Sequence, residues 1–302
     1  MPASRVLIIG CGYIGLPLGA ELVQQGHDVT GIGRSLESRP EVTAAGIRAI
    51  NADITNPGSL KEKIEGSFDW VVNCVSSSHG GPEDYRQVYL QGTRNLIEWL
   101  TDIPPKKFLY TSSTGVYGQD DGSVVKEDHD TQPATEGGKI LAETERVLLA
   151  AAMQHDFPAI ILRVAGIYGP ERTYQLRSFL EGRSRIEGNG LRHLNMIHRD
   201  DVVGAIIAAL QNGRPGELYN AVDNEPVGQV HFLRWLSETL GRDMPPVASP
   251  EELVGKKRGV TDKKVSNRRL KMELGYALRY PTFRQGYTAE IKRLEEAGLL
   301  DL

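Results

Sequence analysis

The stretch that decides the fold is RVLIIGCGYIGLPLGAELVQQGHDVTGIGRS, which runs from Arg5 to Ser35. Its first apolar run predicts a buried strand, the middle has the spacing of an amphipathic helix, and a second apolar run follows. Between strand and helix lies the pattern G-x-G-x-x-G. Gly10 permits a tight turn, Gly12 lets a diphosphate approach the backbone, and Gly15 allows close packing of helix on sheet. In this context the pattern predicts a dinucleotide-binding unit.

The start of the predicted helix suits a diphosphate, because its free backbone N–H groups and its dipole both favour an anion. The predicted cofactor-binding residues of this turn are Gly10, Cys11, Gly12, Tyr13, Ile14 and Gly15. An NAD-specific site usually has an acid at the end of the second strand. Arg34 lies there instead and could pair with a 2′-phosphate, so the sequence favours NADP(H) over NAD(H). Arg34 also fits a solvent-facing turn.

Asp53 lies in NADIT, after a presumed third strand. We expect it either to bind the adenine amino group of the cofactor or to cap a turn or helix. Both roles need a carboxylate at the carboxyl end of a strand. The sequence leaves the two open.

Short apolar runs alternate with amphipathic stretches as far as about residue 165, and helices are predicted at Tyr13 to Gln25, Asp84 to Leu100 and Gly137 to Gln154. The predicted strands are RVLIIG, HDVTGIG, FDWVVNCV, KFLYTSS and AIILRV. This alternation predicts an α/β fold, a Rossmann-like doubly wound parallel sheet with helices on both faces.

Beyond residue 165 the alternation loosens, although RSFLEG, DDVVGAIIAALQNG and QVHFLRWLSETLG have helical spacing. We therefore expect an NAD(P)-binding domain over residues 1–165. Residues 166–302 would form a smaller C-terminal substrate lobe, interwoven with the main domain.

Composition narrows the class of protein. The 302 residues are 40% hydrophobic and 25% charged with a net charge of −4, which is typical of a soluble globular protein and gives no reason to expect a nucleic-acid or membrane partner. No run approaches the roughly 18 apolar residues of a membrane span, and the residues before Val6 are too few for a signal peptide. We expect a cytoplasmic location, reduced thiols at Cys11 and Cys74, and no metal site.

One charged stretch, from Lys256 to Lys271, holds eight Lys and Arg residues against a single acid, Asp262. It fits a solvated loop and helix face. It also fits a clamp for a substrate phosphate, in which Arg268 or Arg269 would supply forked donors.

Five segments occur in a familiar order: GCGYIG, SSTGVYG, RVAGIYGP, NMIHRDDVV and YNAVDNEPV. Together they resemble the extended short-chain dehydrogenase/reductase superfamily, the NAD-dependent epimerases and dehydratases, and the chain resembles an atypical member of it. The resemblance implies an NAD(P) cofactor and a small-molecule substrate, either a sugar nucleotide or another compound with a hydroxyl or carbonyl group. The resemblance also suggests a homodimer in which helices 84–100 and 137–154 form the interface. The alternative is that the apolar faces of these helices pack inward.

The resemblance assigns roles to particular residues. It makes Ser113 the hydroxyl that polarises the substrate oxygen and Lys139 the residue that holds the nicotinamide ribose. Tyr168, Gly169 and Pro170 would line the substrate side, with His198 and Asp201 near the junction of the lobes. Thr135 stands four residues before the lysine, where the family has its general acid/base tyrosine.

Threonine is not a working substitute for that tyrosine, because the pKa of an aliphatic alcohol lies several units above that of a phenol. A proton relay would have to use water, Tyr117, Tyr89 or His79. The leading hypothesis is an NAD(P)-dependent oxidoreductase or epimerase/dehydratase with an altered site. The alternative is a non-catalytic NADP(H)-binding sensor or interaction module.

Overall fold

A computed structural model describes residues 2–77, 80–253 and 261–300. Seven parallel strands form its central sheet, which confirms the predicted α/β class. In spatial order they are β11 (Leu218–Ala221), β7 (Ala159–Val164), β5 (Lys107–Ser113), β4 (Trp70–Asn73), β1 (Arg5–Ile9), β2 (Asp28–Gly33) and β3 (Arg48–Asn51). The order reverses between β1 and β4, so the carboxyl ends of these two strands border a crevice.

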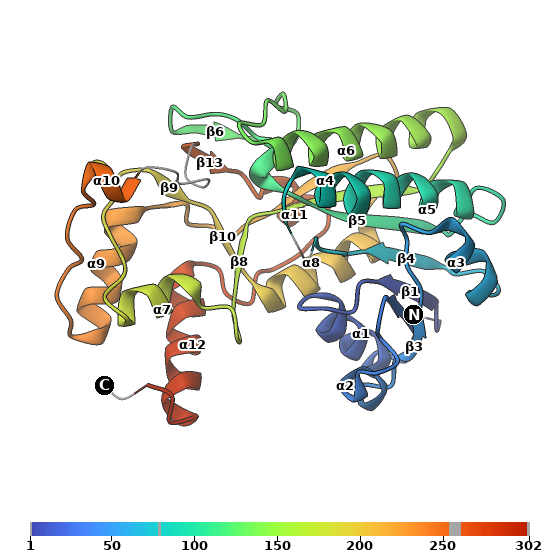
Figure 1. Cartoon of the computed structure of the whole chain (residues 1–302), viewed down its shortest axis with the longest axis horizontal. Helices are drawn as coiled ribbons and strands as arrows, with labels where there is room; N and C mark the ends of the chain where they lie inside the picture. The colour runs from blue at the N-terminus through green and yellow to red at the C-terminus, as the bar shows by residue number, and fades with distance from the viewer. Residues whose placement is uncertain (1, 78–79, 254–260, 301–302) are drawn as a thin grey trace.

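Both faces of the sheet are buried, as its continuous apolar strands require. Along β1, Val6 and Ile8 pack into one hydrophobic cluster, while Leu7 and Ile9 pack into another on the opposite face. Helices cover each face, as Figure 1 shows. One face carries α1 (Gly15–Gln24), α2 (Pro40–Ala44) and α8 (Arg199–Asn212), and the other carries α3 (Pro57–Lys63), α5 (Gly92–Leu100) and α6 (Glu136–His155).

The helix predicted over residues 84–100 is continuous but not uniform. It consists of α4 (Pro82–Tyr85), a π-helical segment η1 (Arg86–Gln91) and then α5. Leu96 and Leu100 of α5, like Leu148 of α6, are buried in the chain's own core. The predicted homodimer face therefore uses part of its apolar surface internally, and the homodimer itself stays a prediction.

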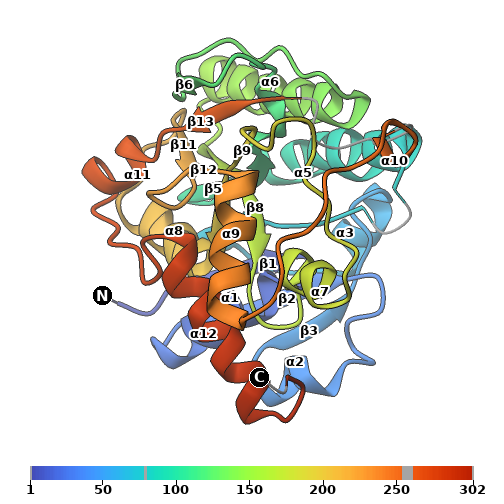
Figure 2. The same cartoon turned by 90° about the vertical axis from the view of Figure 1, so that its left-hand side faces the viewer.

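The smaller lobe packs around a third hydrophobic cluster that includes Phe232, Phe283 and Tyr287. Its helices are α7 (Tyr174–Leu180), α9 (Gln229–Leu240), α10 (Pro250–Leu253) and α12 (Phe283–Glu296), whereas α11 (Arg268–Met272) packs beside β11 of the main sheet. Three two-stranded sheets and a 3-10 turn η2 (Thr114–Val116) complete the structure, and their strands are β6 (Ser123–Val125), β8 (Gly166–Tyr168), β9 (His193–Leu194), β10 (Met196–His198), β12 (Val227–Gly228) and β13 (Lys263–Val265). Figure 2 shows α9 and α12 at the front of the view, and the rings of Phe232 and Tyr287 join them with centres 5.1 Å apart.

Two strands cross the predicted boundary at residue 165. β11 comes from the C-terminal part of the chain but pairs with β7 at the edge of the main sheet, and β13 pairs with β6 from the N-terminal part. Helix α12, by contrast, lies where sequence analysis expected no helix. Its start carries a capping box in which the Thr282 hydroxyl and the Gln285 side chain satisfy backbone N–H groups. None of the helices in the described ranges is both long and apolar enough to span a bilayer.

A buried ion pair fixes α6 against β7 and β5. Arg163 and Glu145 have side chains only 5% and 2% exposed, and Arg163 Nη2 lies 2.7 Å from Glu145 Oε2. Ser112 donates a hydrogen bond of 2.6 Å to the same carboxylate, which ties the end of β5 to the helix. Arg163 also donates to the Tyr117 hydroxyl, at 2.8 Å. These bonds satisfy both charges, so the loss of either partner would leave the other uncompensated.

We predict that Arg163→Met lowers the free energy of unfolding by about 3–5 kcal/mol, because Glu145 would remain buried without its cation. Lys292→Met is the matched control, since it removes an exposed pair with Glu296 and should cost less than about 1 kcal/mol. Urea unfolding of the two variants measures both values. Equal losses would show that the buried pair contributes no more than a surface contact.

Candidate active site

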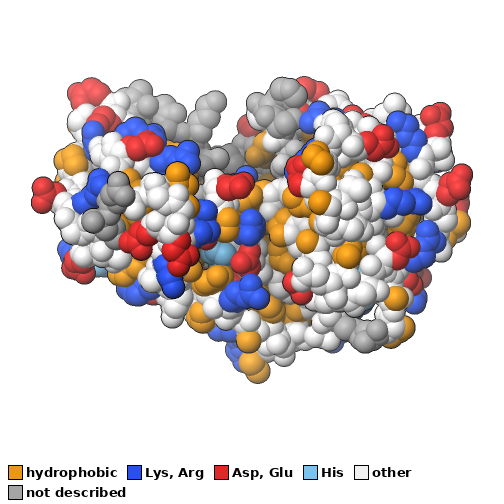
Figure 3. Space-filling view, turned by 90° about the horizontal axis from the view of Figure 1, so that it is seen from below, with side chains coloured by type: hydrophobic (Ala, Val, Ile, Leu, Met, Phe, Trp, Pro, Cys, Tyr) orange, Lys and Arg blue, Asp and Glu red, His pale blue; other side chains and the backbone are white. Residues whose placement is uncertain are grey.

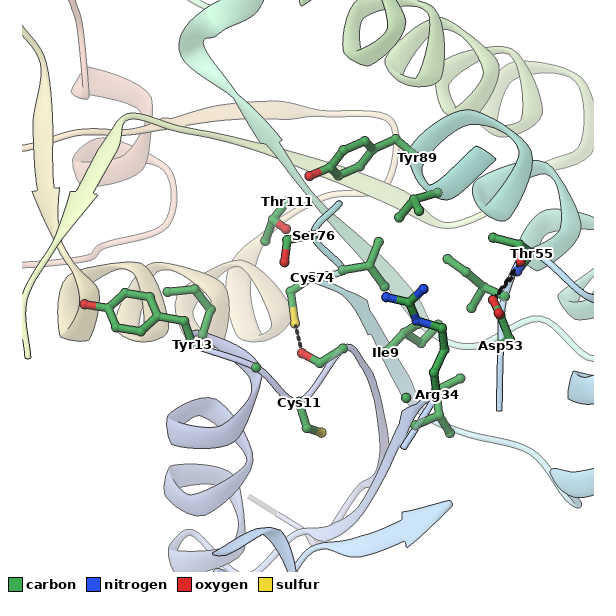
Figure 4. A pocket seen from close by; sticks show the side chains of 18 of the residues that line it. Ile9, Cys11, Tyr13, Arg34, Asp53, Thr55, Cys74, Ser76, Tyr89 and Thr111 are labelled. Atoms are coloured by element: carbon green, nitrogen blue, oxygen red, sulfur yellow. Dashed lines mark hydrogen bonds between the residues drawn. The ribbon is translucent and has the colours of Figure 1, made fainter. Parts of the chain in front are cut away.

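A cavity of about 580 Å³ lies at the carboxyl ends of β1, β2, β4 and β5, where the strand order reverses. The glycine turn forms one wall, the loops after β2 and β3 a second, and η1 with the end of β5 a third. Figure 4 shows the cavity from nearby. In Figure 3 the surface is hollowed between the two lobes, with basic and hydrophobic side chains beside the hollow. A position at this edge of a doubly wound sheet is where such folds bind ligands.

The glycine turn has the geometry that a diphosphate site needs. Gly10 has a φ of +94°, and a Cβ on Gly15 would lie 2.1 Å from the Gly10 carbonyl oxygen, so neither position tolerates a side chain. A Cβ on Gly12 would meet no atom within 4 Å, because this glycine faces the open cavity. Cys11, Tyr13 and Ile14 also line the cavity. The turn thus leaves the N–H groups at the start of α1 accessible to an anion.

Two free thiols, those of Cys11 and Cys74, belong to the glycine turn and to the loop packed against it. Cys74 donates a hydrogen bond of 3.2 Å to the Gly10 carbonyl, and Cys11 is buried near Gly31. Burial raises the pKa of Cys11 to about 12 and that of Cys74 still further. Both remain neutral packing groups rather than nucleophiles. Within the described part of the chain, no group of three or more His, Cys, Asp and Glu side chains is placed to hold a metal ion.

Arg34 lines the cavity at the end of β2, as its position in the sequence predicts, and Figure 4 shows its guanidinium beside the opening. Arg39, which sequence analysis missed, lines the same wall and donates to the Cys11 carbonyl at 2.8 Å. The nearest acid in sequence, Glu37, is instead bound to Asn51 at the end of β3 and does not line the cavity. Arg34 and Arg39 thus place two guanidinium groups on the part of the wall that follows β2, where Arg39 is also paired with Glu41 at 2.7 Å.

Asp53 has the turn role that was one of its two predicted alternatives. Its Oδ1 accepts hydrogen bonds from the backbone and the hydroxyl of Thr55, at 2.9 and 2.8 Å. Asp53 also lines the cavity, next to Ile54. Contact between its carboxylate and adenine stays a prediction.

Ser113, the predicted catalytic hydroxyl, lies at the carboxyl end of β5 and lines the cavity. Its Oγ accepts a hydrogen bond from the Gly115 backbone at 3.0 Å, which caps η2 and fixes the side chain. No described group accepts the hydroxyl hydrogen. Ser113 can therefore donate to an oxygen atom bound in the cavity.

Thr135 and Lys139 are placed differently from Ser113. Thr135 is the N-cap of α6, where its hydroxyl accepts from the Gly138 backbone at 3.1 Å, and such a position favours threonine. The Lys139 ammonium, with its side chain 58% exposed, binds Glu136 at 2.6 Å. Neither residue lines the cavity. The role of Lys139 at the ribose stays a prediction.

Of the three side chains considered as alternative proton carriers, the structure describes Tyr117 and Tyr89. Tyr117 is buried away from the cavity, where its hydroxyl donates to Asn220 and accepts from Arg163. Tyr89 lines the cavity, and its hydroxyl accepts from the Ser77 backbone at 3.1 Å. His79 lies outside the described residues.

The residues predicted for the substrate side gather at the junction of the lobes rather than in the cavity wall. Tyr168 stacks on Tyr287 with ring centres 4.4 Å apart, and the buried His198 ring lies 3.4 Å from Glu290. Asp201 accepts from the Tyr276 hydroxyl and from two backbone N–H groups. From this region, it is Ile167 and Arg172 that line the cavity.

Tyr13 and Arg172 form a contact that sequence analysis did not predict. The Arg172 guanidinium lies 4.4 Å from the centre of the Tyr13 ring, across the lobe junction. The Tyr13 hydroxyl is buried with no hydrogen-bond partner among the described residues, and burial raises its pKa to about 12. It therefore remains protonated and able to donate. The only sequence signal was an aromatic residue inside the glycine turn.

The basic stretch from Lys256 to Lys271 was predicted to form either a solvated surface or a clamp for a substrate phosphate. Arg269 is bound in ion pairs with Glu217 and Glu273, at 2.5 and 2.7 Å, which favours the structural interpretation for this residue. Lys263 is buried, and its ammonium donates to the Tyr117 carbonyl at 2.9 Å. The part of the stretch from residue 256 to 260 lies outside the described residues.

Residues 6–221 of the chain match the model of the NAD dependent epimerase/dehydratase family. It belongs to this family, and so to the extended short-chain dehydrogenases/reductases that its motifs resemble. The match spans the glycine turn, Ser113 and the strands of the main sheet through β11.

Similar proteins cover nearly the whole chain. Protein YeeZ of Escherichia coli is 28% identical over 289 residues, which are 92% of this chain and 97% of YeeZ. The 3-diazoavenalumate denitrifying reductase of a Streptomyces species is 26% identical and covers 95% of this chain and all of its own length. A Methylobacillus flagellatus structure, provisionally described as an NAD-dependent epimerase/dehydratase, is 33% identical with a TM-score of 0.76, covering 97% of this chain and 99% of its own.

The dTDP-glucose 4,6-dehydratase DesIV of Streptomyces venezuelae, solved with NAD bound, shares the fold with a TM-score of 0.81. It is 21% identical, and 97% of each chain is covered.

We predict that Gly12→Ala folds normally but binds NADPH at least tenfold more weakly, because its methyl group would enter the space where the diphosphate approaches the turn. Gly58→Ala in α3 is the control, since it adds the same methyl group at ordinary contact distance at a position that does not line the cavity. Thermal unfolding and calorimetry with NADPH separate folding from binding. If Gly12→Ala bound the cofactor normally, the diphosphate would not lie at this turn.

Proposed function

We propose that the chain is an NAD(P)-dependent oxidoreductase or epimerase/dehydratase that acts on a hydroxyl or carbonyl group of a small molecule such as a sugar nucleotide. The observation that carries this proposal is the Ser113 hydroxyl, held by the Gly115 backbone at the edge of the cavity with its hydrogen available. Family membership supports it, since relatives include dTDP-D-glucose 4,6-dehydratases and a reductase.

The residues of the cavity suggest how the reaction would be divided. The bound cofactor would supply or accept hydride. Ser113 would donate a hydrogen bond to the substrate oxygen and so stabilise the negative charge that develops there. Thr135 would take no part in proton transfer, because its hydroxyl caps α6 and an aliphatic alcohol does not ionise near neutral pH. A group other than threonine must therefore carry the proton.

We further propose that the cofactor is NADP(H). Arg34 and Arg39 both line the wall that follows β2, where a carboxylate would repel a 2′-phosphate. The nearby Glu37 carboxylate is occupied by Asn51 and faces away from that wall. A guanidinium in this position can bind a phosphate with two parallel hydrogen bonds.

We predict that Arg34→Gln raises the Kd for NADPH about tenfold and leaves the Kd for NADH unchanged, because only NADPH carries the 2′-phosphate. Arg48→Gln, which removes an exposed arginine from β3, should change neither value. Calorimetry with both cofactors makes the comparison. An equal loss for NADPH and NADH would argue against a phosphate contact.

A second function, a non-catalytic NADP(H) sensor or interaction module, is favoured by one observation. Thr135 caps a helix and Lys139 binds Glu136, so neither of the family's lysine and tyrosine positions supplies a side chain to the cavity. Cofactor binding would survive this change better than turnover.

A panel of sugar nucleotides, aldehydes and ketones, followed through nicotinamide absorbance, distinguishes the two functions. The enzyme predicts turnover that Ser113→Ala reduces about a hundredfold or more, with the Kd for NADPH unchanged. The control is Ser123→Ala, which removes a hydroxyl from β6 outside the cavity. Tight NADPH binding with no turnover across the panel would favour the sensor.

A further inference from the structure

An aromatic pair occupies the wall of the cavity beside the start of α6, near the position that lacks the family's tyrosine. A Cβ on Gly137 would lie 2.9 Å from Cε1 of Tyr85, so the Tyr85 ring packs directly on the first turn of this helix. The ring of Tyr89 lies edge-on to Tyr85, with centres 4.9 Å apart. Both residues line the cavity. Phenol groups from α4 and η1 are therefore present where α6 supplies none.

Tyr89 is the better placed of the two for proton transfer. It comes from the π-helical segment η1, and such segments are frequent at functional sites. Figure 4 shows its hydroxyl directed toward Thr111 of β5 and Ser76 of the loop after β4. Ser113 is the last residue of β5, and the loop after β4 lies beside the glycine turn. Tyr89 thus lines the same cavity as the glycine turn and Ser113.

The hydrogen bonds of Tyr89 leave its proton available. Its oxygen accepts from the Ser77 backbone at 3.1 Å, and no described group accepts its hydrogen. The Ser77 hydroxyl in turn donates to Asp84 of α4, which ties the loop to the same helical run. Because a backbone N–H stabilises a phenolate, this contact would also hold the oxygen after the proton has left.

We propose that Tyr89 is the catalytic acid and base of this site and replaces the family's tyrosine from a different helix. The inference rests on the proposed oxidoreductase function. In reduction, the bound cofactor would supply hydride to the carbonyl carbon, the phenol of Tyr89 would give its proton to the carbonyl oxygen, and water would then reprotonate the phenolate. In oxidation, the Tyr89 phenolate would take the hydroxyl proton, and the oxidised cofactor would accept the hydride from the substrate carbon.

The surroundings of Tyr89 suit an acid that remains protonated near neutral pH. Burial raises its pKa, and the neighbouring Tyr85 and Asp84 act in the same direction, while the Ser77 contact lowers it. Tyr110 is a further phenol close enough to interact with it. A positive nicotinamide ring in the cavity would lower the pKa of Tyr89, which favours the phenolate when the oxidised cofactor is bound.

The first test needs no substrate. In protein labelled at the tyrosine Cζ carbon, the resonance missing from Tyr89→Phe belongs to Tyr89. We expect NADP⁺ and NADPH to move this resonance to different positions, because the charge on the nicotinamide differs between them. The resonance of Tyr174, which is 66% exposed on α7, should not respond. An identical Tyr89 resonance in both complexes would overturn the proposal.

The second test uses any compound of the panel that is turned over. Tyr89→Phe keeps the ring packed on Tyr85 and removes only the hydroxyl, so kcat should fall about a hundredfold or more with the Kd for NADPH unchanged. Tyr174→Phe should retain normal kcat. Normal kcat in Tyr89→Phe, or a loss in Tyr85→Phe that Tyr89→Phe does not share, would contradict the assignment. Failure of the wild-type chain to bind NADPH would instead remove the proposed function.

Discussion

The close approach of two glycines at the end of β1 is the constraint on which the site depends. A side chain on Gly15 would collide with the Gly10 carbonyl, and one on Gly10 would lie 2.9 Å from Val75 Cα in the loop after β4. Because these glycines carry no side chains, the turn can lie directly against the loop after β4 and lead from β1 into α1. The N–H groups of that helix face the crevice because no side chain separates turn from sheet. The cavity lies where it does for this reason.

Local patterns in the sequence were enough to predict five strands of the main sheet, β1, β2, β4, β5 and β7, and to presume β3, but they did not predict the edge strand β11. They failed where a side chain is placed by a distant partner. Arg39 reaches the cavity through a hydrogen bond to the Cys11 carbonyl, 28 residues away. Helix α12 was missed although Thr282 and Gln285 form a capping box, a signal that the sequence does contain. Its apolar face becomes recognisable only against α9.

In the candidate site, too, the sequence predicts the element on which a residue lies better than the direction in which its side chain points. A resemblance assigns Ser113, Thr135 and Lys139 to places on β5 and α6, and the strand end does bring Ser113 to the cavity. On the helix, however, the Glu136 carboxylate binds the lysine, and the Gly138 backbone N–H of the first turn donates to the threonine hydroxyl. These competing contacts are local and favourable. Without a phenol at position 135, nothing on α6 draws the lysine inward, and the aromatic pair on α4 and η1 packs against the helix instead.

The junction of the lobes links the cofactor turn to the C-terminal segment whichever function holds. Tyr13 extends from the glycine turn and lies under Arg172, with Arg199 of α8 5.6 Å from its ring centre. The same first turn of α8 carries Asp201, whose carboxylate accepts hydrogen bonds from the Tyr276 hydroxyl and from the backbone of Arg279 and Tyr280, in the segment that leads to α12. The Tyr13 ring therefore joins the cofactor turn to arginines from both sides of the junction, and Asp201 extends this chain of contacts to the segment before α12.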